Sequence, residues 1–133
     1  MKIDQDYLKD LLNAFQAEES LYTDINKLKE KGFDHLTDKF LFHIQILEDK
    51  KLIENCTKNS KIGYDFTLDG GISWTIVPLR LTATGHDLIE ALNKSEVWDI
   101  IKMYFKEASI STLVSVGTEL VKKLALEKID NCF

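Results

Sequence analysis

Arginine is nearly missing from this chain of 133 residues, which has Arg80 and no other. Acidic residues outnumber lysine and arginine by 22 to 17, so the formal net charge is −5. The first 50 residues hold 11 acids against 7 lysines, and only residues 51–82 are not net acidic. Surfaces that bind nucleic acid are usually basic, and arginine suits forked contacts with guanine and phosphate. The charge balance therefore counts against a protein that reads DNA bases.

Cysteine and proline are also scarce. Cys56 and Cys132 form no CxxC pair, which predicts free thiols, no disulfide, no zinc site and a reducing, cytoplasmic setting. The one proline, Pro78, lies at the end of a predicted strand. No apolar run approaches the roughly 20 residues of a membrane span, and the polar start MKIDQDYLKD is unlike a signal peptide. We therefore expect a single cytoplasmic domain, with no membrane partner, since this length can bury a core unaided.

Common catalytic and nucleotide-binding motifs are absent, among them GxxxxGK[ST], GxGxxG, HExxH and GxSxG. The histidines are His35, His43 and His86. Asp34, His35 and Asp38 cluster at a helix start, where capping explains them better than a metal ion does. For His86 we expect a hydrogen bond to neighbouring backbone that holds a helix junction together. These observations predict a non-catalytic protein without metal or cofactor.

Three helices are predicted in the first 50 residues, over about 4–18, 24–32 and 36–50, with a short strand at 21–22 between the first two. Gly32 ends the second helix, and a tight turn leads to the third, so this pair predicts a helix-turn-helix. The third helix is expected to bury four apolar residues, Leu36, Phe40, Ile44 and Leu47.

A strand near 51–58 and a β-hairpin over 61–81 are predicted next. Apolar residues alternate on both sides of a glycine turn, which is typical of a hairpin. They are Tyr64, Phe66 and Leu68 before Asp69-Gly70-Gly71, and Ile72, Trp74 and Ile76 after it. Directly after a helix-turn-helix, this hairpin would be a wing. The predicted class is α+β and mostly helical, with a winged helix-turn-helix over residues 1–82.

Residues 83–133 are predicted to form a helical extension packed on that unit, so that the whole chain is one compact domain. In its first helix, Gly85 allows close approach to a neighbour because it has no side chain. The second helix would begin with Ser95 as its cap. Its inner stripe would hold Val97, Ile101, Tyr104, Phe105 and Ala108, with Trp98 beside them.

The last helix, predicted over 109–129, carries a narrow apolar seam. Its members repeat with the 3-4-3-4 spacing of paired helices: Ile110, Leu113, Gly117, Leu120 and Leu124. Such a helix either packs on its own domain or pairs with its copy across a two-fold axis, and the spacing alone favours neither. A homodimer through this seam is therefore one expectation.

Two stretches resemble known proteins. HIQILEDKKLI resembles the HLxxLexxGLI pattern of winged-helix bacterial regulators, but Lys51 stands where glycine is usual, which predicts a different helix cap. LRLTATGHDLIEALNKSEVWDIIK resembles a family of short bacterial and prophage proteins, a domain of unknown function with the hallmark LTxxGHxFLdaxxxxxVW. Matching residues are Leu81, Thr82, Gly85, His86, Leu88, Val97 and Trp98. The resemblance covers roughly 30–126 and implies a winged-helix half with a helical tail, often carried by mobile elements, but no activity.

Two binding functions are compatible with these features. A DNA-binding regulator would present polar side chains to base edges and lysines to phosphates. Its candidate contacts are Thr37, Lys39, Gln45, Lys58 and Lys61.

A protein-binding winged helix would instead use Phe42 and Ile46, one turn apart on the side of the helix not needed for the core. Asp38 and Asp49 lie nearby and would repel phosphate. The alternative is that Phe42 and Ile46 pack under the first or last helix. We favour a non-catalytic adaptor, inhibitor or regulator with a protein partner, encoded by a phage or mobile element, and keep DNA binding as the second hypothesis.

Overall fold

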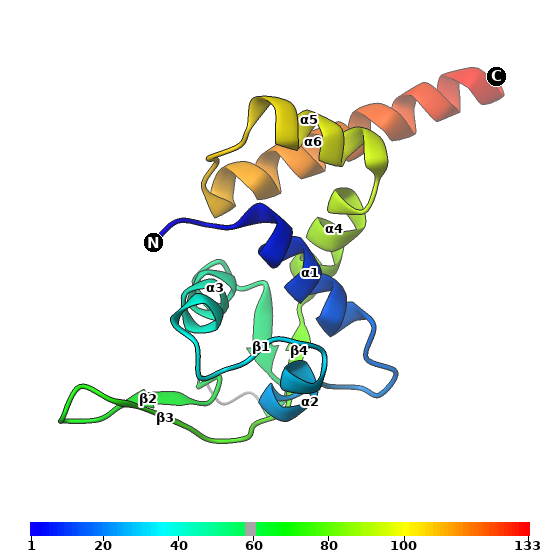
Figure 1. Ribbon diagram of the computed structural model, residues 1–133. Coiled ribbons are helices and arrows are strands. Elements are labelled where there is room, and N and C mark those ends of the chain that lie inside the picture. Colours follow the sequence, from blue (N-terminus) through cyan, green and yellow to red (C-terminus); the bar gives the residue numbers. More distant parts are fainter. Residues whose placement is uncertain (58–60) are drawn as a thin grey trace.

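The computed structural model describes residues 1–57 and 61–133, which fold into helices and short antiparallel strands (Figure 1). In order, the elements are α1 (Gln5–Gln16), α2 (Ile25–Glu30), α3 (Asp38–Asp49), β1 (Ile53–Asn55), β2 (Tyr64–Phe66), β3 (Ile72–Trp74), β4 (Leu79–Leu81), α4 (Ala83–Leu92), α5 (Ser95–Tyr104) and α6 (Ile110–Cys132). The predicted α+β, mostly helical class is confirmed. Over the described ranges, no helix has both the length and the apolar character needed to cross a membrane.

Helix α1 lies between α3 and α4, near the middle of the molecule (Figure 1). Its apolar stripe is fully covered at Leu8, Leu11 and Leu12. The helix begins after Asp4, whose carboxylate accepts a hydrogen bond from the backbone N–H of Tyr7 at 3.0 Å. The predicted helix is confirmed, and α1 forms the centre of the core.

Helix α3 buries Phe40, Ile44 and Leu47, as the pattern predicts. Leu36 does not belong to this face, because α3 begins only at Asp38 and leaves the Leu36 side chain 71% exposed. The cap is Thr37, whose hydroxyl accepts from the Phe40 N–H at 3.2 Å.

Helices α2 and α3 end with the same backbone cap. At the end of α3 the N–H groups of Leu52 and Lys51 donate to Leu47 and Glu48, at 2.8 and 2.9 Å. Two equivalent bonds close α2, and the residue in the left-handed conformation there is Gly32, with φ of 98°. Lys51 takes this position after α3, with φ of 58°. The different cap predicted for Lys51 is therefore wrong, since the chain keeps the glycine-type geometry with a lysine in it.

Strands β1 and β4 pair antiparallel, with Ile53 opposite Leu81 and Asn55 opposite Leu79. All four of these residues are buried. Leu79 also bridges to Thr23, so the single bridge at Thr23 replaces the strand predicted at 21–22. This sheet belongs to the core.

Strands β2 and β3 form a separate hairpin that projects from the body below α3 (Figure 1). Tyr64 lies opposite Trp74 and Phe66 opposite Ile72. The hairpin predicted over 61–81 is confirmed for residues 64–74, but Ile76 lies beyond the end of β3, and residues 79–81 form β4, which pairs with β1 instead.

Helix α4 approaches the end of α3 closely. Thr82 caps α4 by accepting from the Gly85 N–H at 3.1 Å, and its hydroxyl donates to the Lys51 carbonyl at 2.8 Å. A Cβ atom added at Gly85 would lie 2.2 Å from the Leu52 carbonyl oxygen. The threonine and glycine therefore fix this junction. His86 does not, because it is exposed and its ring has no hydrogen-bond partner among the described residues.

Helix α5 departs from the prediction at both ends. Its cap position is Lys94, which makes no side-chain capping bond, so Ser95 is the first helical residue and not the cap. Val97 and Ile101 are fully buried, but Tyr104 is 72% exposed. Trp98 is half-buried, with the ammonium group of Lys9 4.4 Å from its ring centre.

Helix α6 packs its first half on α4 and α5, and its far end projects beyond the body (Figure 1). Leu113 and Gly117 are buried, and a Cβ at Gly117 would lie 3.4 Å from the Cβ of Ala91. Ile110, Leu120 and Leu124 are partly buried against the same core. Much of the seam expected at a dimer contact is thus covered by the chain itself, and Leu113 and Gly117 are not accessible to a partner.

Candidate protein-binding groove

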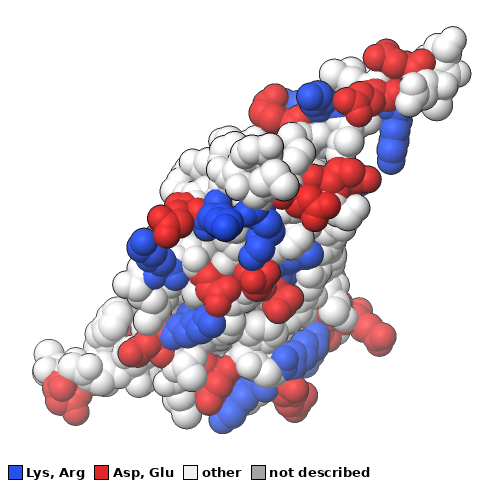
Figure 2. Space-filling view, turned by 45° about the horizontal axis from the view of Figure 1, so that its top comes forward, with Lys and Arg blue, Asp and Glu red and all other residues white. Residues whose placement is uncertain are grey.

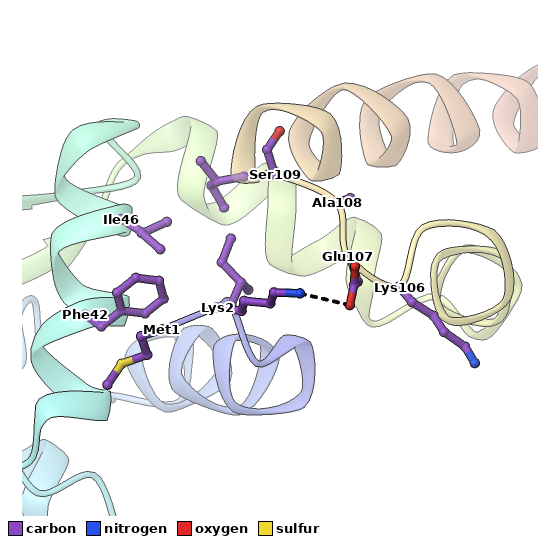
Figure 3. A pocket seen from close by; sticks show the side chains of 10 residues that line it. Met1, Lys2, Phe42, Ile46, Lys106, Glu107, Ala108 and Ser109 are labelled. Atoms are coloured by element: carbon purple, nitrogen blue, oxygen red, sulfur yellow. Dashed lines mark hydrogen bonds and ion pairs between the residues drawn. The ribbon is translucent and has the colours of Figure 1, made fainter.

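An open groove of about 540 Å³ lies between α3, the N-terminal segment and the link from α5 to α6 (Figure 3). Its apolar lining comes from three parts of the chain that are far apart in sequence: Phe42 and Ile46, Met1 and Ile3, and Ala108 and Ile110. Only the tertiary fold brings these side chains together.

The α3 wall consists of the predicted pair, Phe42 and Ile46. Both side chains project from the helix into the groove (Figure 3), and both are half-buried. They lie on the opposite side of α3 from Phe40, Ile44 and Leu47, so the core does not need them. The alternative that they are wholly packed inside is therefore wrong.

Asp38 and Asp49 are exposed at the first and last positions of α3. They stand four residues before Phe42 and three residues after Ile46, which places them along the same side of the helix. The outer surface of α3 thus has an apolar centre with an acidic residue at either end.

The N-terminal segment is tied to α3 through Asp4. The Asp4 N–H donates to Nε2 of His43 at 3.0 Å, and the Lys39 ammonium group pairs with the Asp4 carboxylate at 2.8 Å. These contacts hold residues 1–4 beside α3, and this segment forms the floor of the groove.

The same segment is tied to the far wall. The side-chain amide of Gln5 donates to the Phe105 carbonyl at 2.6 Å, and Lys2 pairs with Glu107 at 3.3 Å (Figure 3). Lys2 and Glu107 are both largely exposed, so their ion pair adds little stability. The buried Gln5 bond is the stronger tie, and it fixes where the α5–α6 link stands.

His43 is neutral in this arrangement. Its Nδ1 lies 2.7 Å from the Lys39 carbonyl and its Nε2 accepts from Asp4, which requires a proton on Nδ1 and none on Nε2. Burial lowers the pKa of His43, and the Lys39 carbonyl and the Asp4 charge oppose that effect only in part. The hydrogen bond from Lys39 lowers the pKa of Asp4, with help from the Tyr7 N–H. The groove is therefore backed by a neutral ring and a fixed carboxylate.

The groove presents a concave, mainly apolar surface to a binding partner. The Ser109 hydroxyl caps α6 by accepting from the Thr112 N–H at 3.2 Å and also donates to the Thr112 hydroxyl. Lys106 lies on the rim and points away from Phe42 and Ile46 (Figure 3). Across the described part of the chain, no group of three or more His, Cys, Asp or Glu side chains could hold a metal ion.

Three of the residues considered for DNA contact, Thr37, Lys39 and Lys61, are engaged within the protein. The Thr37 hydroxyl caps α3 and donates to the Asp34 carbonyl at 2.8 Å. Lys39 pairs with Asp4, and Lys61 pairs with Asp65 at 3.0 Å. Gln45 is half-buried, and Lys58 lies outside the described residues.

The hairpin itself carries no cation: residues 64–76 contain Asp65 and Asp69 and no lysine or arginine. Figure 2 shows lysines and acids interspersed over the face it presents, with only acidic charges on the hairpin at its lower left. Arg80, the one arginine, is paired with Glu54 across β1 and β4. On that face, the described residues form no lysine stripe from α3 to the hairpin tip.

The sequence did not predict two of the three parts that line the groove, namely the N-terminal segment and the link from α5 to α6. Ile3 directly precedes the capping Asp4, a position that often packs on the following helix, and this is the one signal that could have placed it. Nothing in the sequence pattern brings residues 106–110 next to α3, because that contact depends on the path of α5 and α6.

Comparisons with other proteins give one result. Residues 2–111 match a family model described as Hypothetical protein (DUF2513). The expected relationship to a family of unknown function is thereby confirmed, with a match that takes in α1 and ends at the start of α6. No curated protein and no solved structure matches the chain.

Proposed function

The chain belongs to the DUF2513 family, and we propose that this member is a non-catalytic binding protein whose groove receives a helical segment of another protein. The observation that carries the proposal is the placement of Phe42 and Ile46 in an open groove of about 540 Å³. Apolar side chains that line a groove are a common docking site for one face of an amphipathic helix. An adaptor, an inhibitor or a regulator could each use such a groove.

The charges around the groove favour a basic partner. Asp38 and Asp49 flank the apolar pair on α3, so a docked helix would gain from lysine or arginine near both ends of its apolar stripe. The net charge of −5 would also speed the approach of a basic segment.

We further propose that α2, α3, β1, the β2–β3 hairpin and β4 constitute a winged helix-turn-helix. Their order along the chain, and the hairpin that projects beside α3, support this assignment (Figure 1). In this proposal the second unit, residues 83–133, is not only a support, because Ala108 and Ile110 supply one wall of the groove. Binding would therefore need both parts of the chain.

DNA binding remains the second candidate, since a winged helix-turn-helix is often a DNA reader. The ion pairs of Lys39 and Lys61 and the acidic hairpin make it the weaker candidate, because phosphate contacts would first have to break those pairs.

The proposal is tested by selecting peptides from a displayed library of random amphipathic helices against the full chain. Selected peptides should carry apolar residues at helical spacing flanked by lysine or arginine, and fluorescence polarisation would measure their affinity. Ile46→Lys places a charge inside the groove and should weaken binding by about tenfold or more. The matched control is Leu126→Lys, at a 61%-exposed position near the projecting end of α6, and it should bind as the natural chain does.

Two results would contradict the proposal. One is a set of selected peptides whose affinity is the same for Ile46→Lys and the natural chain, both with native circular dichroism. The other is tight, sequence-selective binding to duplex DNA in a mobility-shift assay, weakening steeply as salt is raised, which would favour the second candidate.

A further inference from the structure

The β2–β3 hairpin has one apolar face, and only its base is covered. Residues directly opposite each other in an antiparallel pair share a face, so Tyr64, Trp74, Phe66 and Ile72 lie together. At the base, the Trp74 ring lies 5.8 Å from the Phe40 ring, and the Tyr64 hydroxyl donates to Glu48 at 2.8 Å. Further out, Phe66 is 64% exposed. The outer half of the hairpin therefore presents apolar side chains to solvent.

Among the residues that the structure describes, the backbone of β3 has no partner on its outer side. Within the hairpin, the Thr75 N–H donates to Gly63 at 2.7 Å, which identifies the residues that bond across the pair. Ile72 and Trp74 alternate with those residues, so their backbone N–H and C=O groups point away from β2. The sheet has no third strand among the described residues, and β3 forms its lower edge in Figure 1.

The two edges of the hairpin differ in charge. Residues 72–77 read ISWTIV and contain no charged side chain, whereas Asp65 lies in β2 and Asp69 in the turn. Exposed edge strands are usually protected by charged residues, proline, a bulge or a very short strand. The strand β3 has the β-branched and aromatic composition of a good strand, and its length of three residues is the one protection that it carries.

We propose that two copies of the chain pair edge to edge through β3, antiparallel and about a two-fold axis at Trp74, to give a four-stranded sheet. In this register Ile72 faces Ile76 of the partner subunit, and Ser73 faces the partner's Thr75. The apolar face of each hairpin then continues into that of its copy, because side chains alternate with a period of two.

A second copy is the occupant that the charges favour. An uncharged strand meets its own copy without like-charge repulsion, while pairing through β2 would bring the Asp65 carboxylates of both copies to one short sheet. The proposal also gives the expected homodimer a site that the chain does not already cover, in contrast to Leu113 and Gly117 on α6. It does not depend on the groove at α3.

Sedimentation velocity on the full chain, from micromolar to millimolar concentration, tests the dimer. The natural chain should become dimeric as concentration rises. Ser73→Lys combined with Thr75→Lys places like charges opposite each other twice and should weaken association by about tenfold or more. Ser73→Lys combined with Thr75→Glu uses the same exposed positions but faces each lysine with a glutamate, so it should restore the dimer in this register alone. Circular dichroism checks that both variants are folded.

Any of these outcomes would overturn the proposal: a natural chain that stays monomeric at millimolar concentration, a Lys/Lys variant that dimerises as well as the natural chain, or a Lys/Glu variant that remains monomeric. Loss of the dimer in Leu126→Lys, with β3 unchanged, would also overturn it by placing the contact on α6.

Discussion

The two sheets have the same size, but one is buried in the core and the other is largely exposed to solvent. Each consists of two strands of three residues, paired antiparallel. In β1–β4 the alternate residues Ile53, Leu79 and Leu81 are at most 3% exposed, whereas Phe66 in the hairpin is 64% exposed. Alternation tells us that a strand has an apolar face, but the packing of other elements decides whether that face is covered. One sheet therefore supports the fold, and the other is available for contact with a partner.

A short polar clamp joins the two sheets. Asn55, at the end of β1, is buried and donates from its side-chain amide to the Lys61 carbonyl at 2.8 Å. Its side-chain oxygen accepts from the Thr57 N–H at 2.9 Å. Since Lys61 lies just before β2, this clamp sets where the hairpin leaves the body.

The comparison of the two sheets predicts the largest difference in stability between two leucine-to-alanine substitutions, one in the buried sheet and one at the hairpin turn. Leu79→Ala in β4 should lower the free energy of unfolding by about 2–5 kcal/mol, because it leaves a cavity in a closely packed core. Leu68→Ala at the hairpin turn, where the side chain is fully exposed, should change it by no more than about 0.5 kcal/mol. Urea unfolding followed by circular dichroism measures both. Similar losses in the two variants would mean that the hairpin is part of the core.

The sequence predicts the elements well and their surroundings less well. Helix spacing located the six helices of the described residues, and the glycine turn located the hairpin, because these signals are local. Leu36 and Tyr104 fitted their helical stripes yet are exposed, since α3 starts after the first and α5 ends at the second. Both lie at helix ends, where periodicity does not reveal which residues the neighbours cover.

The candidate site was predictable only from the α3 side. Phe42 and Ile46 stand out because the core face of α3 is complete without them. The opposing wall at Ala108 and Ile110 lies more than 60 residues further along the chain. Such long-range contacts leave no local pattern in a single sequence.

A change of pH should have a smaller effect on stability, and this effect should arise in the body of the molecule and not in the hairpin. The folded-state pKa of His43 is lowered, so its contribution to stability is complete above the unfolded value of about 6.5 and is lost as pH falls below it. His43→Gln can keep an acceptor near the Asp4 N–H but does not titrate. At pH 8 it should cost about 1–3 kcal/mol through imperfect hydrogen bonding.

Urea unfolding at pH 8 and pH 5 checks this prediction. The natural chain should lose more stability between the two pH values than His43→Gln does. Equal losses would mean that His43 titrates normally and that its bond to Asp4 does not stabilise the fold. The amide chemical shift of Leu68, fully exposed at the hairpin turn, should stay unchanged over this range, because the turn lies away from the tie between α1 and α3.

The smallest expected change in stability concerns Lys51, which lies just before the buried sheet. The left-handed positions beside and within the hairpin are glycines, Gly63 and Gly70, whereas Lys51 holds that conformation just before β1. Lys51→Gly removes the strain of a side chain at positive φ but adds freedom to the unfolded chain, so the net gain should be about 0.5–1 kcal/mol. Gly32→Lys, at the equivalent cap of α2, is the reciprocal control and should cost a similar amount, because a Cβ there meets no atom within 4 Å and only the backbone conformation is penalised. Thermal unfolding of both variants measures the difference. A loss of stability in Lys51→Gly would mean that the lysine side chain itself stabilises the cap, and the shared geometry of the two helix ends would then not determine their energies.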